Sequence, residues 1–246
     1  MYKIVIVTIS FISGLLLLFS ILGERHSDRI LVVGTNAEFP PYCFIQNGEI
    51  VGFDIDVAKE VCHRLDKEIS LKDMPFDALI PELALGTVDF VAAGMSPTVE
   101  RAKRVLFTQP YVIGDPLVIV TMAKPLTLEE LVGKTVVVNE GYTSDLFLSK
   151  KEGMHLVRLA NPADAFLALD SGRADAFVTA KSSFESFLRQ NPNSQYVISK
   201  IDDTDQECAL AVSKLHPDLL VHIQKALDAM ETDGTIEKFK KTWMLP

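Results

Sequence analysis

The sequence predicts an α/β protein of two lobes, each built on an open, mostly parallel sheet with helices on its faces. Short apolar segments such as Arg29–Thr35 and Thr135–Val138 are typical of strands buried on both sides of a sheet. Helical patterns alternate with these segments, which favours parallel strands joined by helices. The alternation runs through two cycles without a long linker, so we expect two lobes with a small-molecule site in the cleft between them.

The first cycle covers the chain from about residue 29 to residue 93. Its expected elements are, in order, a strand at Arg29–Thr35, a helix from about Asp54 to Leu65, a strand at Glu68–Lys72, a helix from Phe76 to about Leu85, and a strand at Asp89–Ala93. Asn47 and Gly48 are typical of a tight turn. Asp54 or Asp56 is expected to cap the first helix, and Gly86 suits a left-handed conformation at the end of the second.

The second cycle begins near Pro116 and leads into the C-terminal helices. Its expected elements are, in order, a strand at Pro116–Val120, a short helix at Thr127–Leu131, a strand at Thr135–Val138, a helix that follows Gly141–Ser144 and ends near Lys151, a strand at Leu156–Leu159, a helix at Pro162–Ser171, a strand at Ala174–Val178, a helix at Ser182–Gln190, a strand at Cys208–Val212, a helix at His216–Met230, and a last helix that ends near Trp243. Thr127 and Glu130 have the spacing of a capping box.

The composition is that of a globular protein. Of the 246 residues, 48% are hydrophobic and 23% are charged, so the chain can bury a core and is not expected to be disordered. The net charge of −9 disfavours a nucleic-acid partner, because binding phosphates requires clustered positive charge. Cys62 lies in an apolar helical pattern and is expected in the core. Cys43 and Cys208 are candidates for a disulfide, which the sequence does not decide. No residue spacing suggests a metal, and we expect no cofactor.

The first 22 residues are typical of an export segment. Lys3 supplies a positive charge, and the uncharged, mostly apolar run Ile4–Leu22 follows it. This run is longer than an ordinary signal-peptide core and just long enough to span a bilayer. We expect a cleaved signal peptide and a periplasmic or other extracytoplasmic location, with an uncleaved N-terminal anchor as the alternative.

Several spaced motifs carry a resemblance to a known family. They are Gly34–Tyr42, Val51–Ala58, Phe76–Pro81, Ala93–Arg101, Leu106–Tyr111 and Asp233–Phe239. Together they resemble the polar amino-acid-binding proteins of bacterial ABC transporters, solute-binding family 3, over nearly all of residues 30–244. The arginine-binding branch is the most similar, through Ala93–Ser96 and Leu106–Tyr111.

The resemblance implies the two-lobed periplasmic-binding-protein fold of type II, with two strands crossing between the lobes. These strands are expected at about Leu117–Val120 and Ala209–Val212. The first lobe is expected to comprise residues 29–114 and 213–246, and the second lobe residues 115–212 with the crossing strands. The implied partners are a small amino acid, trapped as the lobes close, and the membrane permease of an ABC transporter. We expect a monomer.

The resemblance also assigns the grip on the ligand carboxylate. Arg101 matches the arginine that holds this group, and a guanidinium makes two parallel bonds to a carboxylate. Gly94, Met95 and Ser96 match a loop that offers a backbone and a hydroxyl contact, where glycine permits close approach. Arg101 taken alone would be an ordinary surface arginine, and the surrounding motif favours the binding role.

Aromatic side chains are expected around the ligand side chain. Phe39 and Phe76 match an aromatic pair that sandwiches it, and Tyr42 is a weaker candidate. Asn36 stands where many relatives carry a carboxylate that binds a cationic side chain, and an amide brings no charge there. On its own evidence, either phenylalanine is as well explained as a core residue.

The second lobe is expected to contribute the loop Gly141–Ser144. Tyr142, Thr143 and Ser144 match a segment whose hydroxyl and helix N-terminus meet the ligand carboxylate. Thr143 or Ser144 is expected to act as the N-cap of the following helix as well.

One departure concerns the ligand amine. Most relatives place an acid near position 180, where this chain has Ala180, and a buried ammonium without a counter-charge costs several kcal/mol. Lys181 offers a contact to a second ligand carboxylate, which suits cystine or a diamino dicarboxylic acid, and glutamine is a further alternative ligand. The acids considered as substitutes are Glu38, Glu140, Asp145 and Glu207.

Two other functional classes were weighed. A cyclohexadienyl-dehydratase-like enzyme on the same fold would need an acid or base in the cleft, and no His, Asp or Glu falls at a matching position. The expectation is therefore a binding protein without catalytic activity. A sensing domain of a larger receptor is disfavoured because no further domain follows Trp243–Pro246.

Overall fold

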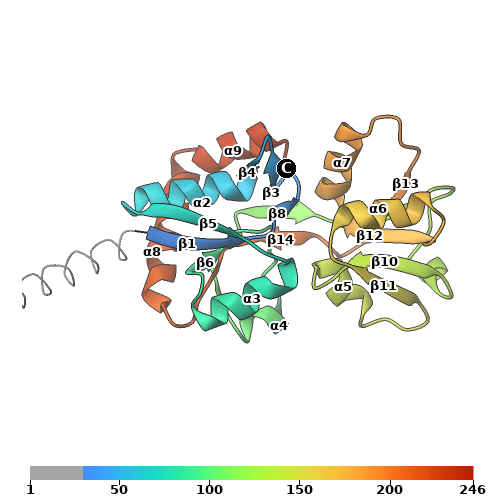
Figure 1. Ribbon diagram of the computed structural model, residues 1–246, viewed down its shortest axis with the longest axis horizontal. Helices are drawn as coiled ribbons and strands as arrows, with labels where there is room; N and C mark the ends of the chain where they lie inside the picture. Colours follow the sequence, from blue (N-terminus) through green and yellow to red (C-terminus); the bar gives the residue numbers. More distant parts are fainter. Residues whose placement is uncertain (1–29, 246) are drawn as a thin grey trace, which may run out of the picture.

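The structure is a computed structural model that describes residues 30–245, so the expected export segment lies outside the described residues. Two five-stranded sheets lie side by side, and helices flank each of them (Figure 1). We call the half built on the first sheet the first lobe and the other half the second lobe. The arrangement confirms the expected two-lobed α/β fold. Among residues 30–245, no helix has the length and apolar character needed to cross a membrane.

The first sheet mixes parallel and antiparallel strands. Its order is β5 (Glu68–Asp73), β1 (Ile30–Thr35), β6 (Phe90–Val91), β15 (Ala211–Val212) and β7 (Leu106–Phe107). β1 runs parallel to β5 and β6, whereas β15 is antiparallel to β6 and β7. The helices of this lobe are α2 (Phe53–Arg64), α3 (Phe76–Leu85), α4 (Val99–Ala102), α8 (Pro217–Thr232) and α9 (Thr235–Trp243). α2, α8 and α9 pack against one another, and α3 lies on the other side of the sheet (Figure 1).

Three of the predicted turns and caps are confirmed. Asn47 and Gly48 have φ values of 53° and 83° and join β3 (Cys43–Gln46) to β4 (Glu49–Val51) in a hairpin, beside the short β2 (Glu38–Phe39). Gly86 ends α3 in the left-handed conformation. The Thr127 N–H donates to Glu130 Oε2 (2.8 Å) and the Glu130 N–H donates to Thr127 Oγ1 (3.4 Å), as a capping box requires, before the single 3₁₀ turn η1 (Glu129–Leu131).

The expected cap of α2 is wrong. Its N-cap residue is Gly52, with a φ of 133°, and no side chain caps the helix. Asp54 is fully buried instead, and its carboxylate accepts hydrogen bonds from the Gly94 N–H and the Tyr111 hydroxyl. Asp56 accepts a hydrogen bond from the indole of α9. Capping preferences describe a helix end that meets water, whereas tertiary neighbours cover this one.

The three central strands of the second sheet are buried on both faces. The order of this sheet is β11 (His155–Leu159), β10 (Thr135–Asn139), β12 (Ala176–Ala180), β9 (Leu117–Thr121) and β13 (Val197–Lys200). Its helices are α5 (Thr143–Leu148), α6 (Pro162–Asp170) and α7 (Lys181–Gln190). Val136 and Val138 belong to one hydrophobic cluster and Val137 to another, so successive residues of β10 face opposite layers. Burial on both faces explains the unbroken apolar runs that predicted these strands.

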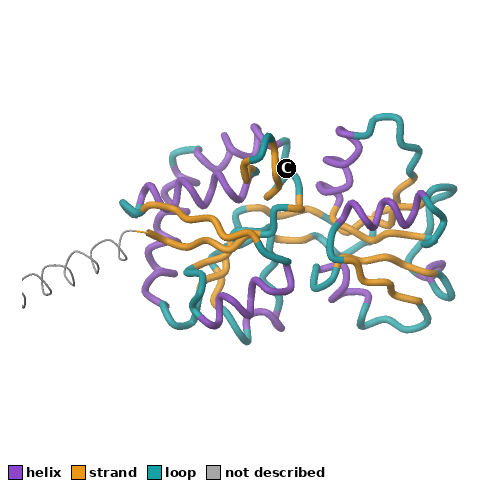
Figure 2. Tube along the Cα trace, viewed as in Figure 1, coloured by secondary structure: helices purple, strands orange, loops and turns teal. Residues whose placement is uncertain are grey.

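The strands that cross between the lobes differ from the expected pair. β8 (Val112–Asp115) and β14 (Gln206–Cys208) pair in an antiparallel sheet of their own, and they run between the two lobes (Figure 2). The expected Leu117–Val120 belongs to β9 in the second sheet, and the expected Ala209–Val212 contains β15 of the first sheet. Apolar runs mark strands inside a covered sheet, whereas β8 and β14 each expose part of their length and lack such a run.

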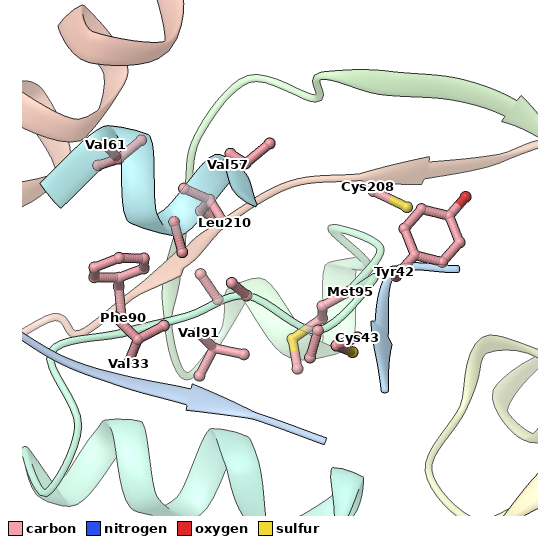
Figure 3. Packing of buried hydrophobic residues seen from close by; sticks show 14 of the residues in the cluster. Val33, Tyr42, Cys43, Val57, Val61, Phe90, Val91, Met95, Cys208 and Leu210 are labelled. Carbon is pink, nitrogen blue, oxygen red and sulfur yellow. The ribbon is translucent and has the colours of Figure 1, made fainter. Parts of the chain in front are cut away.

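The core of the first lobe extends to the boundary between the lobes. Figure 3 shows Tyr42 beside Cys208 at one end of this cluster and Val61 at the other. Cys62 is buried in the core, as expected. Cys43 and Cys208 are buried as well. All three cysteines are free, so Cys43 and Cys208 do not form a disulfide in this structure.

Candidate functional site

The first component of the site is a buried cation without an ionic partner. Arg101 lies on α4, and its side chain is only 5% exposed. Its Nη1 donates to the Ser96 carbonyl oxygen (2.8 Å), its Nη2 donates to the Gly141 carbonyl oxygen (2.9 Å), and its guanidinium lies 5.3 Å from the centre of the Phe76 ring. No ion pair among residues 30–245 includes Arg101. Burial lowers its pKa to about 10, so the group remains charged at neutral pH and can bind an anion.

The loop after β6 lies against this arginine. Gly94 has a φ of 60°, and a Cβ added to it would lie 2.7 Å from Phe39 Cε1, so the position requires glycine. Ser96 receives a hydrogen bond from the Thr143 hydroxyl across the lobe boundary (3.3 Å). Met95 is fully buried and, with Arg101, lines a cavity of about 250 Å³. The structure therefore brings the expected loop residues next to Arg101.

Four aromatic rings meet where the lobes touch. Phe39 and Tyr42 stack with ring centres 5.3 Å apart and planes 12° apart. The ring of Tyr142, from the second lobe, lies 5.3 Å from Phe39 and 4.5 Å from Phe76. The expected aromatic pair therefore faces the second lobe, but Tyr142 contacts both members of it.

Asn36 presents an acceptor to this aromatic group. Its side chain is 3% exposed, and its Nδ2 donates to the Met74 carbonyl oxygen (3.2 Å) and to Glu38 (3.4 Å). Its Oδ1 accepts a hydrogen bond from the Tyr142 hydroxyl (2.8 Å). Since the amide nitrogen is held within the first lobe, the oxygen is the atom that Asn36 offers to a partner.

The loop of the second lobe is held by a carboxylate. Asp145 accepts hydrogen bonds from the Gly141 N–H (3.1 Å) and from Arg158 Nε (2.9 Å). The expected N-cap is wrong, because α5 begins at Thr143, its N-cap residue is Tyr142, and no side chain caps it. The reason is that Thr143 turns its hydroxyl across the cleft to Ser96. Ser144 is buried in the first turn of α5.

The candidate acids and Lys181 occupy different places. Glu38 and Glu140 line a cavity of about 280 Å³ between the lobes, together with Asp73 and Asp77. Glu207 lines a separate cavity of about 270 Å³ that also contains Thr143, whereas Asp145 is committed to its pair with Arg158. The side chain of Lys181 is half exposed and pairs with Glu185 (3.4 Å).

Besides Asp145, the lobe boundary contains another buried carboxylate, Asp115, which sequence reasoning missed. Asp115, the last residue of β8, accepts hydrogen bonds from the Tyr42 hydroxyl (3.0 Å), the Ser182 N–H (2.9 Å) and the Ser182 hydroxyl (2.5 Å). Burial raises its pKa. It connects the first lobe to the start of α7, for which Ala180 provides no side-chain cap. An acid before a proline carries no local signal for this role.

The assembled residues bring a cation, apolar faces and acidic groups to one cleft between the lobes. Arg101 supplies positive charge, the aromatic rings supply apolar faces, and the acidic cavity lies beside Asn36. Asn36, the loop Gly94–Ser96 and the loop Gly141–Thr143 follow β1, β6 and β10, so the site lies at the carboxyl ends of strands. None of the described residues forms a cluster of metal ligands.

Comparisons with known proteins show what this chain is similar to. The family described as bacterial extracellular solute-binding proteins, family 3, matches residues 31–246. The ABC transporter arginine-binding protein 1 of Escherichia coli (strain K12) is 32% identical over 90% of this chain and 93% of its own length. An ancestral arginine-binding protein bound to arginine has a TM-score of 0.83 at 38% identity and covers 87% of this chain and 98% of its own. The structure of an ancestral arginine-binding protein bound to glutamine has a TM-score of 0.82 at 39% identity, covering 87% and 97%.

Proposed function

Since the chain belongs to the bacterial extracellular solute-binding proteins of family 3, we propose that it captures a basic amino acid, arginine first, in the cleft between its lobes and delivers it to the permease of an ABC transporter. The observation that carries this proposal is Arg101, a buried cation whose polar partners are two carbonyl oxygens. A ligand carboxylate would replace the Gly141 carbonyl as its partner and form two charge-assisted bonds.

The cavity beside Asn36 supports a cationic ligand side chain. Its lining includes the carboxylates of Glu38, Asp73, Asp77 and Glu140, and it includes no lysine or arginine. A guanidinium that enters this cavity gains from its negative charge and can donate a hydrogen bond to Asn36 Oδ1. Glutamine also offers donors to Asn36 but brings no charge, so we place it after arginine. Cystine and diamino dicarboxylic acids would bring a second carboxylate to an acidic cavity, and Lys181 already pairs with Glu185, so we place them after arginine as well.

The cellular role follows from the family and from the start of the sequence. We propose that residues 1–22 export the protein, that it works outside the cytoplasm as a monomer, and that it carries out no reaction on its ligand. The proposed division of the chain assigns residues 29–114 and 213–246 to the first lobe and residues 115–212 to the second. In this role, closure of the lobes on the ligand presents a surface to the permease.

Isothermal titration calorimetry of the purified protein with single amino acids tests the proposal. The panel contains arginine, lysine, histidine, glutamine, glutamate and cystine, with agmatine as the matched control because it keeps the guanidinium and lacks the carboxylate. We expect arginine to bind most tightly and agmatine not to bind. The proposal fails if no amino acid binds, and turnover of prephenate or arogenate would contradict a role without catalysis.

A further inference from the structure

Tyr142 belongs by sequence to the second lobe, but its side chain belongs to the core of the first. It lies on the loop between β10 and α5, and its N–H donates to the Asn139 carbonyl oxygen within the second lobe (3.1 Å). Its ring, however, packs on Phe39 and Phe76 and is only 6% exposed. A side chain so placed crosses the cleft and fills part of it.

The Gly141 carbonyl and the Tyr142 hydroxyl bind the two side chains, Arg101 and Asn36, to which the proposed ligand would bind. The Gly141 carbonyl oxygen accepts a hydrogen bond from Arg101 Nη2 (2.9 Å), where a ligand carboxylate would bind. The Tyr142 hydroxyl donates to Asn36 Oδ1 (2.8 Å), where a side-chain donor would bind. Between these two groups, the ring of Tyr142 contacts both members of the aromatic pair. The loop thus reproduces an acceptor, an apolar body and a donor in the order in which arginine presents them.

The cavities around Tyr142 agree with this occupation. One cavity of about 280 Å³ is lined by Asn36 and Phe76, and another of about 250 Å³ is lined by Phe76 and Arg101. Tyr142 lies between the groups that the two cavities contain, because it bonds to Asn36 and follows Gly141, which bonds to Arg101. A ligand that spans from Arg101 to Asn36 therefore has to displace the Tyr142 ring.

We propose that Tyr142 is a built-in competitor of the ligand: its side chain occupies the ligand's place between Phe39 and Phe76, and the affinity of the protein is set by the need to displace it. The identity of the ligand in this inference rests on the proposed function. Because only the molecules with Tyr142 displaced can bind, the apparent Kd equals the intrinsic Kd divided by the fraction of such molecules. Displacing Tyr142 removes its contacts with the aromatic rings and its hydrogen bond to Asn36. A ligand side chain that offers a flat face and a donor replaces both, so it is favoured over a short aliphatic side chain.

Three variants measure this competition. Tyr142→Ser removes the ring and the long reach of the hydroxyl, and Tyr142→Phe keeps the ring but loses the bond to Asn36. Tyr196→Phe is the matched control, because Tyr196 lies in the second lobe and its hydroxyl bonds to Asp170 (2.6 Å), away from the cleft. The affinity for L-arginine is measured by calorimetry, and the opening of the ligand-free protein is measured as its radius of gyration by small-angle X-ray scattering.

We expect Tyr142→Ser to bind arginine about tenfold more tightly than the wild type, with a larger radius of gyration in the absence of ligand. Tyr142→Phe should lie between the two, and Tyr196→Phe should match the wild type. Equal or weaker arginine binding by both Tyr142 variants would overturn the proposal and make Tyr142 an ordinary ligand contact or a bystander. If neither the wild type nor any variant binds an amino acid, the proposed function fails, and the radius of gyration alone then decides: an unchanged value in Tyr142→Ser overturns the competition, and a larger one supports it.

Discussion

In the first lobe two buried charged groups have no ionic partner, whereas Asp145, the buried carboxylate that holds the cleft loop of the second lobe, has one. Arg101 is bonded to carbonyl oxygens, and Asp54 is bonded to the Gly94 N–H and a tyrosine hydroxyl. In the second lobe, Asp145 accepts a hydrogen bond from Arg158 Nε at 2.9 Å. Residues of both lobes line the same cleft, so their distance from the cleft does not explain why one lobe pairs its buried charge and the other does not.

In the proposed role, this difference distinguishes the lobe that binds the ligand from the lobe that covers it. An unpaired buried charge costs several kcal/mol, and a fold keeps one when something else neutralises it at the moment of function. We therefore infer that the first lobe keeps Arg101 for the ligand carboxylate, beside a loop that is bonded to Asp54. The buried carboxylate of the second lobe holds the Gly141 loop instead. We infer that this loop covers the ligand that the first lobe binds.

Removing one arginine from each lobe is the strongest test of this division. We expect Arg101→Ala to lower arginine affinity by about 2–5 kcal/mol, because it removes the buried partner of the ligand carboxylate. Arg158→Ala is the matched control, since the Arg158 side chain is 42% exposed and its removal leaves Asp145 the hydrogen bonds from the Gly141 N–H and the Ser149 hydroxyl. Calorimetry measures the affinities, and thermal unfolding confirms that both variants fold.

Comparable losses of affinity in the two variants would contradict the division, because the second lobe would then contribute as much charge to the ligand as the first. Retained affinity in Arg101→Ala would show that the carboxylate is bound elsewhere.

The second test uses pH, and it concerns Asp54 beneath the binding loop. Burial raises the pKa of Asp54 to about 6 from an ordinary value of 3.8. The folded protein therefore holds a proton at this group more tightly than the unfolded chain, and stability falls as pH rises from about 4 to about 6. At about 1.4 kcal/mol for each pH unit between the two pKa values, the loss is on the order of 3 kcal/mol.

Urea unfolding between pH 4 and pH 7 measures this loss. Asp54→Asn cannot ionise, so its stability should fall less steeply with pH than that of the wild type, whatever its absolute value. Asp202→Asn, which changes an exposed carboxylate of the second lobe, should keep the wild-type slope. Identical slopes for the wild type and Asp54→Asn would mean that Asp54 is not a strained buried charge.

Features that depend on neighbouring residues in the chain could be predicted from the sequence. The capping box of Thr127 and Glu130 and the left-handed Gly86 follow from rules that act over a few residues. The buried strands of both sheets followed from apolar runs, because covered strands have no polar face. The placement of Arg101 beside Ser96 followed from the resemblance of Ala93–Arg101 to the family motif, not from a local rule.

Features that depend on contacts between distant segments could not be predicted in the same way. Asp54 has the local pattern of a helix cap, and only the approach of Gly94 and Tyr111 makes it a buried acceptor. Asp115 joins Tyr42 to Ser182, two residues far from it in the chain, and no local pattern encodes such a bridge. The crossing strands carried too little apolar character to be recognised, and that lack is a property of strands with exposed residues.

The smallest expected effect is a difference in stability between alanine variants of two glycines that have the same backbone conformation. Gly94 in the first lobe has a φ of 60° and Gly172 in the second has a φ of 67°, so alanine at either position is strained by about 1 kcal/mol. Around Gly172 nothing lies within 4 Å of an added Cβ, whereas at Gly94 the Cβ would lie 2.7 Å from the Phe39 ring. We therefore expect Gly94→Ala to lose about 2 kcal/mol or more of stability, since overpacking adds to the strain, and to bind arginine more weakly. Gly172→Ala should lose about half as much and keep its affinity. Equal losses of stability and of arginine affinity in the two variants would mean that the Phe39 ring moves aside without cost. The first lobe would then not hold its binding residues in place before the ligand arrives.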